Sequence, residues 1–71
     1  MTLRSLRGAE PAANAARRVG VVRTTWLGWE TGRRAPDAGD IQKIAIAYGL
    51  TPAAVGELVA ALAVLRPQAG I

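Results

Sequence analysis

Hydrophobic side chains recur every three or four positions in five short stretches of this chain, and glycine or proline stands between the stretches. That spacing lines one face of a helix, whereas a half-buried strand would alternate strictly between apolar and polar residues. The stretches predict helices at about 2–7, 11–19, 23–31, 37–48 and 52–66. A chain of 71 residues forms one domain with a small core. The sequence therefore predicts an all-α fold, a compact five-helix bundle over residues 1–66 with a flexible C-terminal tail at 67–71.

The predicted helix ends carry residues that suit them. A side-chain oxygen at the N-cap accepts a hydrogen bond from the first turn, and glycine reaches the left-handed conformation that stops a helix. Pro11 would be the first residue of its helix, with the Glu10 carboxylate at the positive end of the helix dipole. The predicted N-caps are Thr2, Asp37 or Asp40, and Thr51, and the predicted stops are Gly8, Gly20, Gly32 and Gly49.

The apolar stripes identify the candidate core. Trp26 and Trp29 stand three residues apart on one helix face, so we expect both indole rings in the core. Stacking on bases is the alternative, and it suits single strands or flipped-out nucleotides. The other expected core positions are Leu3, Leu6, Ala15, Ala16, Val19, Ile41, Ile44, Ala45, Tyr48, Val55 and Leu58.

The stretch from Gly20 to Pro36 has the outline of a helix-turn-helix. Gly20 would stop one helix, a corner of two valines would follow, and the next helix would begin at about Arg23. In this motif the second helix enters the major groove of DNA with its N-terminal residues facing the bases. Gly28 falls inside that helix, where glycine costs roughly 1 kcal/mol relative to alanine. Either something approaches it closely, such as a DNA backbone or base edge, or the position is exposed and has drifted.

The charge of the chain is basic and clustered. Nine Lys and Arg against five Asp and Glu give a net charge of +4, and all but one of the nine are arginine. The planar guanidinium fork suits phosphate and guanine because it donates two parallel hydrogen bonds. A basic bias alone would fit any soluble surface, but clustering favours nucleic acid. Five bases lie within residues 17–34, where Glu30 is the only acid.

The side-chain inventory argues against an enzyme. Without histidine or cysteine, the chain lacks the commonest general base, the commonest metal ligands and any disulfide. Asp37 and Asp40 could form a catalytic carboxylate pair, but helix capping explains their spacing better. We therefore expect no catalytic residue, no metal and no cofactor. No apolar run approaches the roughly 20 residues that span a bilayer, and no secretory signal begins the chain, so we expect a cytoplasmic protein without a membrane partner.

Three blocks of the sequence resemble the phage Cro/repressor-type helix-turn-helix family, also called the XRE-like family. Residues 16–29 contain the corner and the second helix, and ETGRRAP at 30–36 is similar to the family's Glu-x-Gly-x-x-x-Pro exit. The third block is IAIAYGLT at 44–51. The resemblance implies a lambda-repressor-like bundle that acts as a small sequence-specific transcriptional regulator, in the nucleoid or, for a phage, in the host cytoplasm.

By position, the resemblance also implies roles for single residues. Arg23 would be the strongest base-contacting side chain, with its fork on guanine O6 and N7. Glu30 matches a glutamate that pairs with an arginine of the first helix, for which Arg4 is expected. The base-contacting set would be Arg23, Thr24 and Gly28, and the phosphate-binding set Arg17 or Arg18, Thr25, Arg33 and Arg34.

Two departures from the family pattern weaken the expected DNA contacts. Val22 stands where the family has a Ser or Thr cap, and Glu10-Pro11-Ala12 replaces a Thr-Gln helix start, with one extra residue. A common phosphate contact is thereby lost, and an acid faces the DNA backbone instead. We therefore expect DNA binding with limited sequence specificity.

The last helix offers an interface. One domain makes few DNA contacts, so useful specificity would need two copies on half-sites about 34 Å apart. The helix continues beyond the turns that close the core, and an apolar surplus often marks an interface. We expect a homodimer through Val59, Leu62 and Leu65. In the alternative arrangement, Leu62 and Leu65 fold back onto the first helix.

The alternative function is a protein-interaction module. The helix-turn-helix scaffold would then bind another regulator or a host protein through its C-terminal helix, as an anti-repressor does. Val22 and the weak start of the second helix favour this alternative, whereas the arginine cluster argues against it. An antitoxin that binds both a toxin and its own promoter would combine the two. The expected partners are thus double-stranded DNA, a second copy of the chain and, in the alternative, a regulatory protein.

Overall fold

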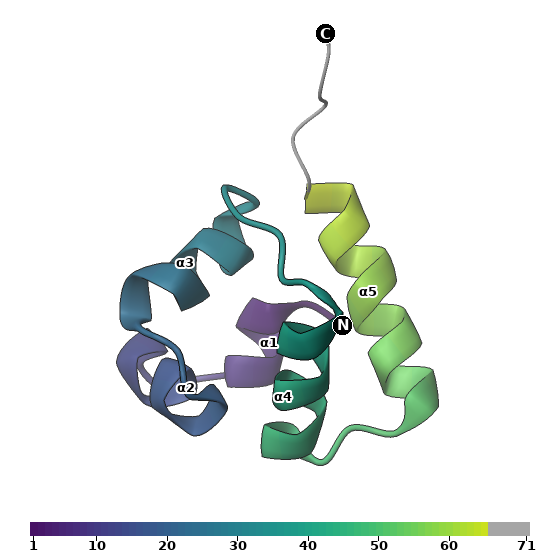
Figure 1. Ribbon diagram of the computed structural model, residues 1–71, viewed down its shortest axis with the longest axis horizontal. Coiled ribbons are helices and arrows are strands. Elements are labelled where there is room, and N and C mark those ends of the chain that lie inside the picture. Colours follow the sequence, from purple (N-terminus) through teal and green to yellow (C-terminus); the bar gives the residue numbers. More distant parts are fainter. Residues whose placement is uncertain (66–71) are drawn as a thin grey trace, which may run out of the picture.

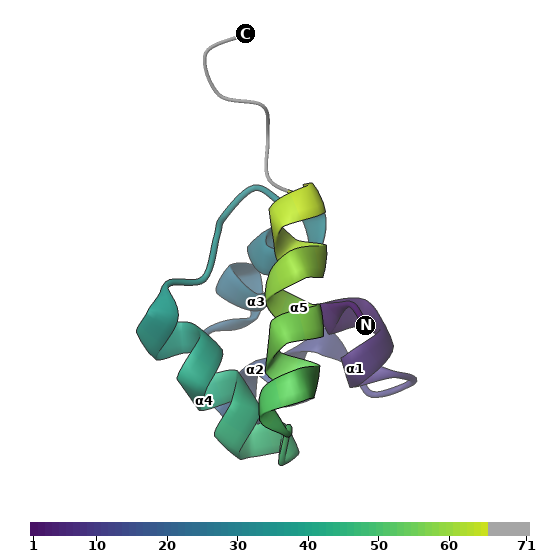
Figure 2. The ribbon, with the colours of Figure 1, turned by 90° about the vertical axis from the view of Figure 1, so that its right-hand side faces the viewer.

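Within the part of the chain that the structure describes, five helices make up the fold, as the sequence predicts. The computed structural model describes residues 1–65, so the predicted tail at 67–71 lies outside the described residues. The helices are α1 (Leu3–Arg7), α2 (Ala12–Val19), α3 (Arg23–Thr31), α4 (Ala38–Tyr48) and α5 (Pro52–Leu65). In Figure 1, α2 and α3 lie on one side of the molecule and α5 on the other, with α1 and α4 between them. Turned by 90°, α5 stands in front, with α4 and α1 to its two sides (Figure 2).

Local side-chain caps set the beginnings of α1, α4 and α5. Thr2 Oγ1 accepts from the Ser5 N–H at 3.0 Å, while Ser5 Oγ accepts from the Thr2 N–H at 2.9 Å. Asp37 and Asp40 form the same reciprocal capping box, at 2.8 and 3.2 Å. Thr51 Oγ1 accepts from the Ala54 N–H at 3.1 Å. The predicted N-caps are therefore confirmed, and the two aspartates begin α4.

Pro11 lies one position outside its predicted place. Its backbone is extended, at φ −59° and ψ 146°, and its carbonyl accepts from the N–H groups of Asn14 and Ala15. Pro11 is thus the N-cap and Ala12 is the first helical residue, because the proline carbonyl already begins the hydrogen-bond ladder of α2. The expectation of proline as the first helical residue was wrong by that one position.

Two tryptophans form the centre of the core. Trp26 is fully buried and Trp29 is 2% exposed, and their ring centroids lie 6.1 Å apart at an interplanar angle of 58°. The ring of Tyr48 also lies close to Trp26, with a centroid separation of 6.3 Å. The expectation that both indoles are core residues is confirmed. The other buried hydrophobic residues are Leu3, Ala12, Ala15, Ala16, Val19, Ile44 and Leu58.

Helix α5 buries one face and exposes the other. Leu58 is fully buried, and Leu62 is half-buried against the core. Val59 is 46% exposed and Val64 85% exposed. The side chain of Leu65, the third predicted interface position, lies outside the described residues. No helix within residues 1–65 is both long and apolar enough to cross a membrane.

Candidate nucleic-acid interface

The corner between α2 and α3 turns on Gly20. This residue takes the left-handed conformation, with φ 89° and ψ 30°, and so stops α2. Its N–H and that of Val21 both donate to the Ala16 carbonyl, at 2.8 and 2.9 Å, which satisfies the open end of the helix. Val22 precedes α3 in an extended conformation and supplies no side-chain cap. The helix-turn-helix is therefore formed with its predicted boundaries, including the missing cap.

A polar cluster beneath α3 fixes the orientation of that helix. Arg7 donates to both carboxylate oxygens of Glu30, from Nε at 2.7 Å and from Nη2 at 2.9 Å. Trp26 Nε1 donates to the same carboxylate, and Arg7 Nη1 donates to the Glu10 carbonyl at 2.9 Å. The hydrogen bonds from Arg7 hold the pKa of the Glu30 carboxyl below its ordinary value, against the opposing effect of burial.

The expectation that Glu30 pairs with Arg4 was therefore wrong. Arg4 is exposed on α1, whereas Arg7, one turn later at the end of that helix, faces α3. The sequence indicated an arginine of the first helix but not which one, because the choice depends on how α1 packs. Glu30 has the structural role that the sequence predicted for it.

The outer face of α3 is the candidate contact surface. Trp26 and Trp29 occupy the inner face, so the opposite face of the helix points away from the core. A shallow hollow along that face is lined by Thr24, Leu27, Gly28, Thr31, Arg33 and Arg34. Sequence reasoning missed Leu27 and Thr31 as members. The helical period could have found Thr31, which lies opposite the two tryptophans, whereas Leu27 lies at the side of the helix and also packs against the core.

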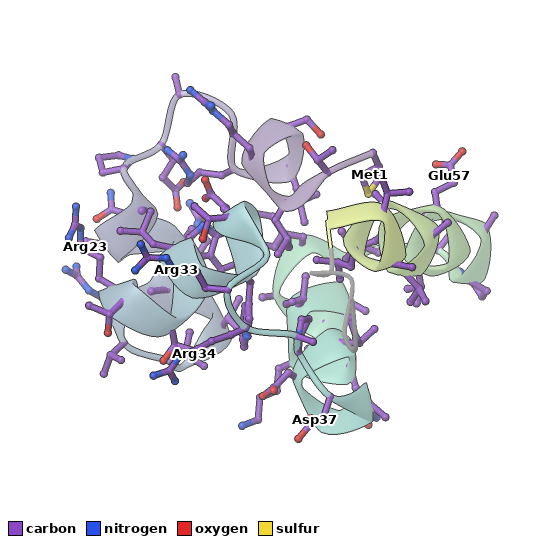
Figure 3. All side chains as sticks on the ribbon, turned by 90° about the horizontal axis from the view of Figure 1, so that it is seen from above. Met1, Arg23, Arg33, Arg34, Asp37 and Glu57 are labelled. Atoms are coloured by element: carbon purple, nitrogen blue, oxygen red, sulfur yellow. The ribbon has the colours of Figure 1, made fainter. Side chains whose placement is uncertain are left out.

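Arginines stand at both ends of this surface. Arg23 is exposed at the beginning of α3, and Arg33 and Arg34 are exposed in the segment that follows it. Figure 3 shows Arg33 and Arg34 on different sides of α3, with Arg23 toward the other end of the helix. Thr25 is half-buried and does not line the hollow. The structure thus brings Thr24, Arg33 and Arg34 to one hollow on the outer face, while Arg23 is exposed at the beginning of the helix and does not line that hollow.

Gly28 lies beneath another side chain. It is buried, and a β-carbon built on it would lie 3.1 Å from both Cγ and Cδ of Arg34. The close neighbour that the sequence indicated for Gly28 is therefore the stem of Arg34, within the same chain. The direct contact of Gly28 with a base edge stays a prediction, and the Arg34 stem lies between this position and the solvent-facing side of the hollow.

A second basic group lies on α2. Arg18 donates to both carboxylate oxygens of Glu10, from Nε at 2.7 Å and Nη2 at 2.9 Å, while Arg17 is exposed. The hydrogen bonds from Arg18 lower the pKa of the Glu10 carboxyl. The sequence left Arg17 and Arg18 as alternatives for a phosphate contact. Since Glu10 occupies the guanidinium of Arg18, Arg17 is better placed than Arg18 to contact a phosphate.

Comparison with known proteins agrees with this geometry. Residues 1–58 match the family model of a helix-turn-helix domain, a span that includes all of α1 to α4 and the first half of α5. No curated protein and no solved structure gives a significant match to the chain.

Proposed function

Since the chain belongs to the helix-turn-helix domain family, we propose that it is a small sequence-specific DNA-binding transcriptional regulator of the Cro/repressor kind. In this proposal α3 enters the major groove. The observation that carries it is the division of α3 into two faces. Trp26 and Trp29 bury one face, and the other presents a shallow hollow that Thr24, Arg33 and Arg34 help to line, with Arg23 exposed at the beginning of the helix.

Base contacts would begin at the N-terminus of α3. Arg23 is exposed there, and a guanidinium fork on guanine is worth about 1–3 kcal/mol of discrimination. Thr24 lines the hollow and would meet a base edge or a thymine methyl. Leu27, on the same face, adds an apolar surface for a methyl group. Arg17 and Arg33 would bind phosphates, and Thr25 would lie at the edge of the contact surface. Because these arginines neutralise phosphates, the affinity for DNA should fall steeply as the salt concentration rises.

A homodimer through α5 belongs to the same proposal. Val59 and Leu62 line an apolar hollow on α5, together with Ala35, Pro36, Ile41 and Ala63. Leu62 also packs against the core, as the alternative of a folded-back helix requires. A second copy would place two α3 helices on half-sites about 34 Å apart. The same hollow favours the second candidate function, a protein-interaction module that binds a regulatory protein through α5.

The test of the proposal is a selection from a random duplex DNA pool near physiological salt, followed by sequencing of the retained DNA. An enriched, two-fold symmetric site whose guanines lose preference in Arg23→Ala would support α3 as the recognition helix and the dimer together. Retention without an enriched sequence would overturn sequence-specific binding. No retention at all would favour the protein-interaction module, and α5 would then be the surface to test.

A further inference from the structure

We infer that Arg34 is a specificity-determining residue that contacts a guanine base. We also infer that the missing side chain of Gly28 leaves the space in which the Arg34 stem packs, a space called here the Gly28 seat. This inference rests on the proposed DNA-binding function and deepens it. The sequence suggested a phosphate contact for Arg34. The structure instead places its side chain against the outer face of α3, which is the face proposed to enter the major groove.

Two independent contacts join Arg34 to Gly28. The backbone N–H of Arg34 donates to the Gly28 carbonyl at 3.2 Å. The side-chain stem lies so close that a β-carbon on Gly28 would be 3.1 Å from Cγ and Cδ and 3.4 Å from Cβ. Glycine is the only residue that leaves this space open, because a contact of 3.1 Å would require the stem to shift. The close approach also explains why glycine stands inside α3, where it weakens the helix.

Packing of the Arg34 stem in the Gly28 seat restricts the positions that its guanidinium can reach. A long arginine in an exposed loop would normally sample many rotamers and lose entropy when it binds. Here the stem rests on the helix, and the side chain borders the same hollow as Thr24 and Thr31. A guanidinium held beside the base-facing residues is suited to guanine O6 and N7, which accept two parallel hydrogen bonds. Arg33 borders the same hollow, but the three atoms nearest to a β-carbon on Gly28 all belong to Arg34.

The experiment compares the sites selected from a random duplex pool by the wild type and by Arg34→Ala, Arg34→Lys and Arg33→Ala. We expect Arg34→Ala to lose preference for guanine at one position of each half-site by about 5- to 150-fold, with other positions unchanged. Arg34→Lys keeps the charge but not the fork, so it should lose most of the same preference. Arg33→Ala should weaken binding to all sequences alike. If Arg34→Ala also weakens all sequences equally, Arg34 is a phosphate contact and the inference is wrong.

Gly28→Ala tests the seat separately. The added methyl should displace the Arg34 stem and reduce preference at the same base pair, while circular dichroism and thermal unfolding show an intact fold. An unchanged preference at that base pair would overturn the role of Gly28. The two failures remain distinct. If the wild-type protein enriches no site, the proposed function is overturned. If the wild type enriches a site and Arg34→Ala selects the same site with the same preferences, only the inference is overturned.

Discussion

The guanidinium of Arg7 donates to both carboxylate oxygens of Glu30, at 2.7 and 2.9 Å, and so ties the end of α1 to α3. The two side chains are 18% and 7% exposed, which shields the pair from water. Trp26 Nε1 donates to the same carboxylate, so one acid joins α1, α3 and the aromatic core. The orientation of the candidate DNA-contacting face therefore depends on an ion pair beneath it as well as on apolar packing.

Replacement of Glu30 by glutamine should destabilise the fold. The substitution keeps the shape of the side chain but removes the charge that strengthens its hydrogen bonds, so we expect the free energy of unfolding to fall by about 1–3 kcal/mol. Urea denaturation followed by circular dichroism measures the loss. Arg7→Ala should also lower the melting temperature, whereas Arg4→Ala should leave it nearly unchanged because Arg4 is exposed. Equal losses from the two arginines would contradict the pairing with Arg7.

Stability should fall at acidic pH. Hydrogen bonds from arginine lower the pKa of both Glu30 and Glu10 below the ordinary value of 4.5. The unfolded chain therefore takes up protons before the folded chain does. The stabilisation is fully present above the unfolded pKa and is lost as the pH falls through the folded pKa. Thermal unfolding should show this decline below about pH 5, and a shallower one in Glu30→Gln. A decline between pH 6 and 7 would need another cause, since the chain has no histidine.

The helix boundaries could be predicted from the sequence because their signals are local. The oxygens of Thr2, Asp37 and Thr51 act within three residues, and Gly20 stops its helix by its own backbone conformation. The partner of Glu30 could not be predicted in the same way. Arg4 and Arg7 lie on one short helix, and only its packing on α3 brings Arg7 to the carboxylate.

The contact between Gly28 and Arg34 could not be predicted from the sequence for a similar reason. The pattern indicated a close neighbour at Gly28 but not its identity. The chain reverses at Gly32, in the left-handed conformation with φ 80°, and only that reversal brings Arg34 back onto α3. The sequence therefore predicted which helix carries the candidate DNA-contacting face, but only some of the residues that line it.

Replacement by alanine should change the free energy of unfolding in opposite directions at Gly20 and Gly56. Gly20 has φ 89°, a conformation that costs an L-residue roughly 1–2 kcal/mol, so Gly20→Ala should destabilise the fold by about that amount. Gly56 lies inside α5, and a β-carbon there would meet nothing within 4 Å. Gly56→Ala should therefore stabilise the fold by up to about 1 kcal/mol. Urea denaturation distinguishes the two signs. Stabilisation by Gly20→Ala would contradict the left-handed corner.

Removal of the Glu10 carboxylate should strengthen DNA binding. In the folded chain Glu10 occupies the fork of Arg18, at 2.7 and 2.9 Å. Glu10→Gln releases this guanidinium and removes a negative charge, so we expect higher affinity for duplex DNA and a salt dependence steeper by about one phosphate contact. Fluorescence anisotropy at several salt concentrations measures both. As a matched control, Glu57→Gln removes the same charge from exposed α5 and should leave the slope unchanged. A slope that Glu10→Gln does not change would place Arg18 away from the DNA.

A charge on one face of α5 should separate the proposed dimer. Val59 is 46% exposed and borders the apolar hollow, so Val59→Lys would bring an ammonium group into the interface without disturbing the core. Leu62 is less suitable because it packs against the core. Val64, five residues after Val59 and 85% exposed, provides the matched control on the opposite side of the helix. Sedimentation should show a dimer for the wild type and Val64→Lys but a monomer for Val59→Lys. Only Val59→Lys should lose affinity for a two-half-site duplex while it keeps its affinity for a single half-site. If Val59→Lys leaves both mass and DNA affinity unchanged, α5 is not the dimer interface.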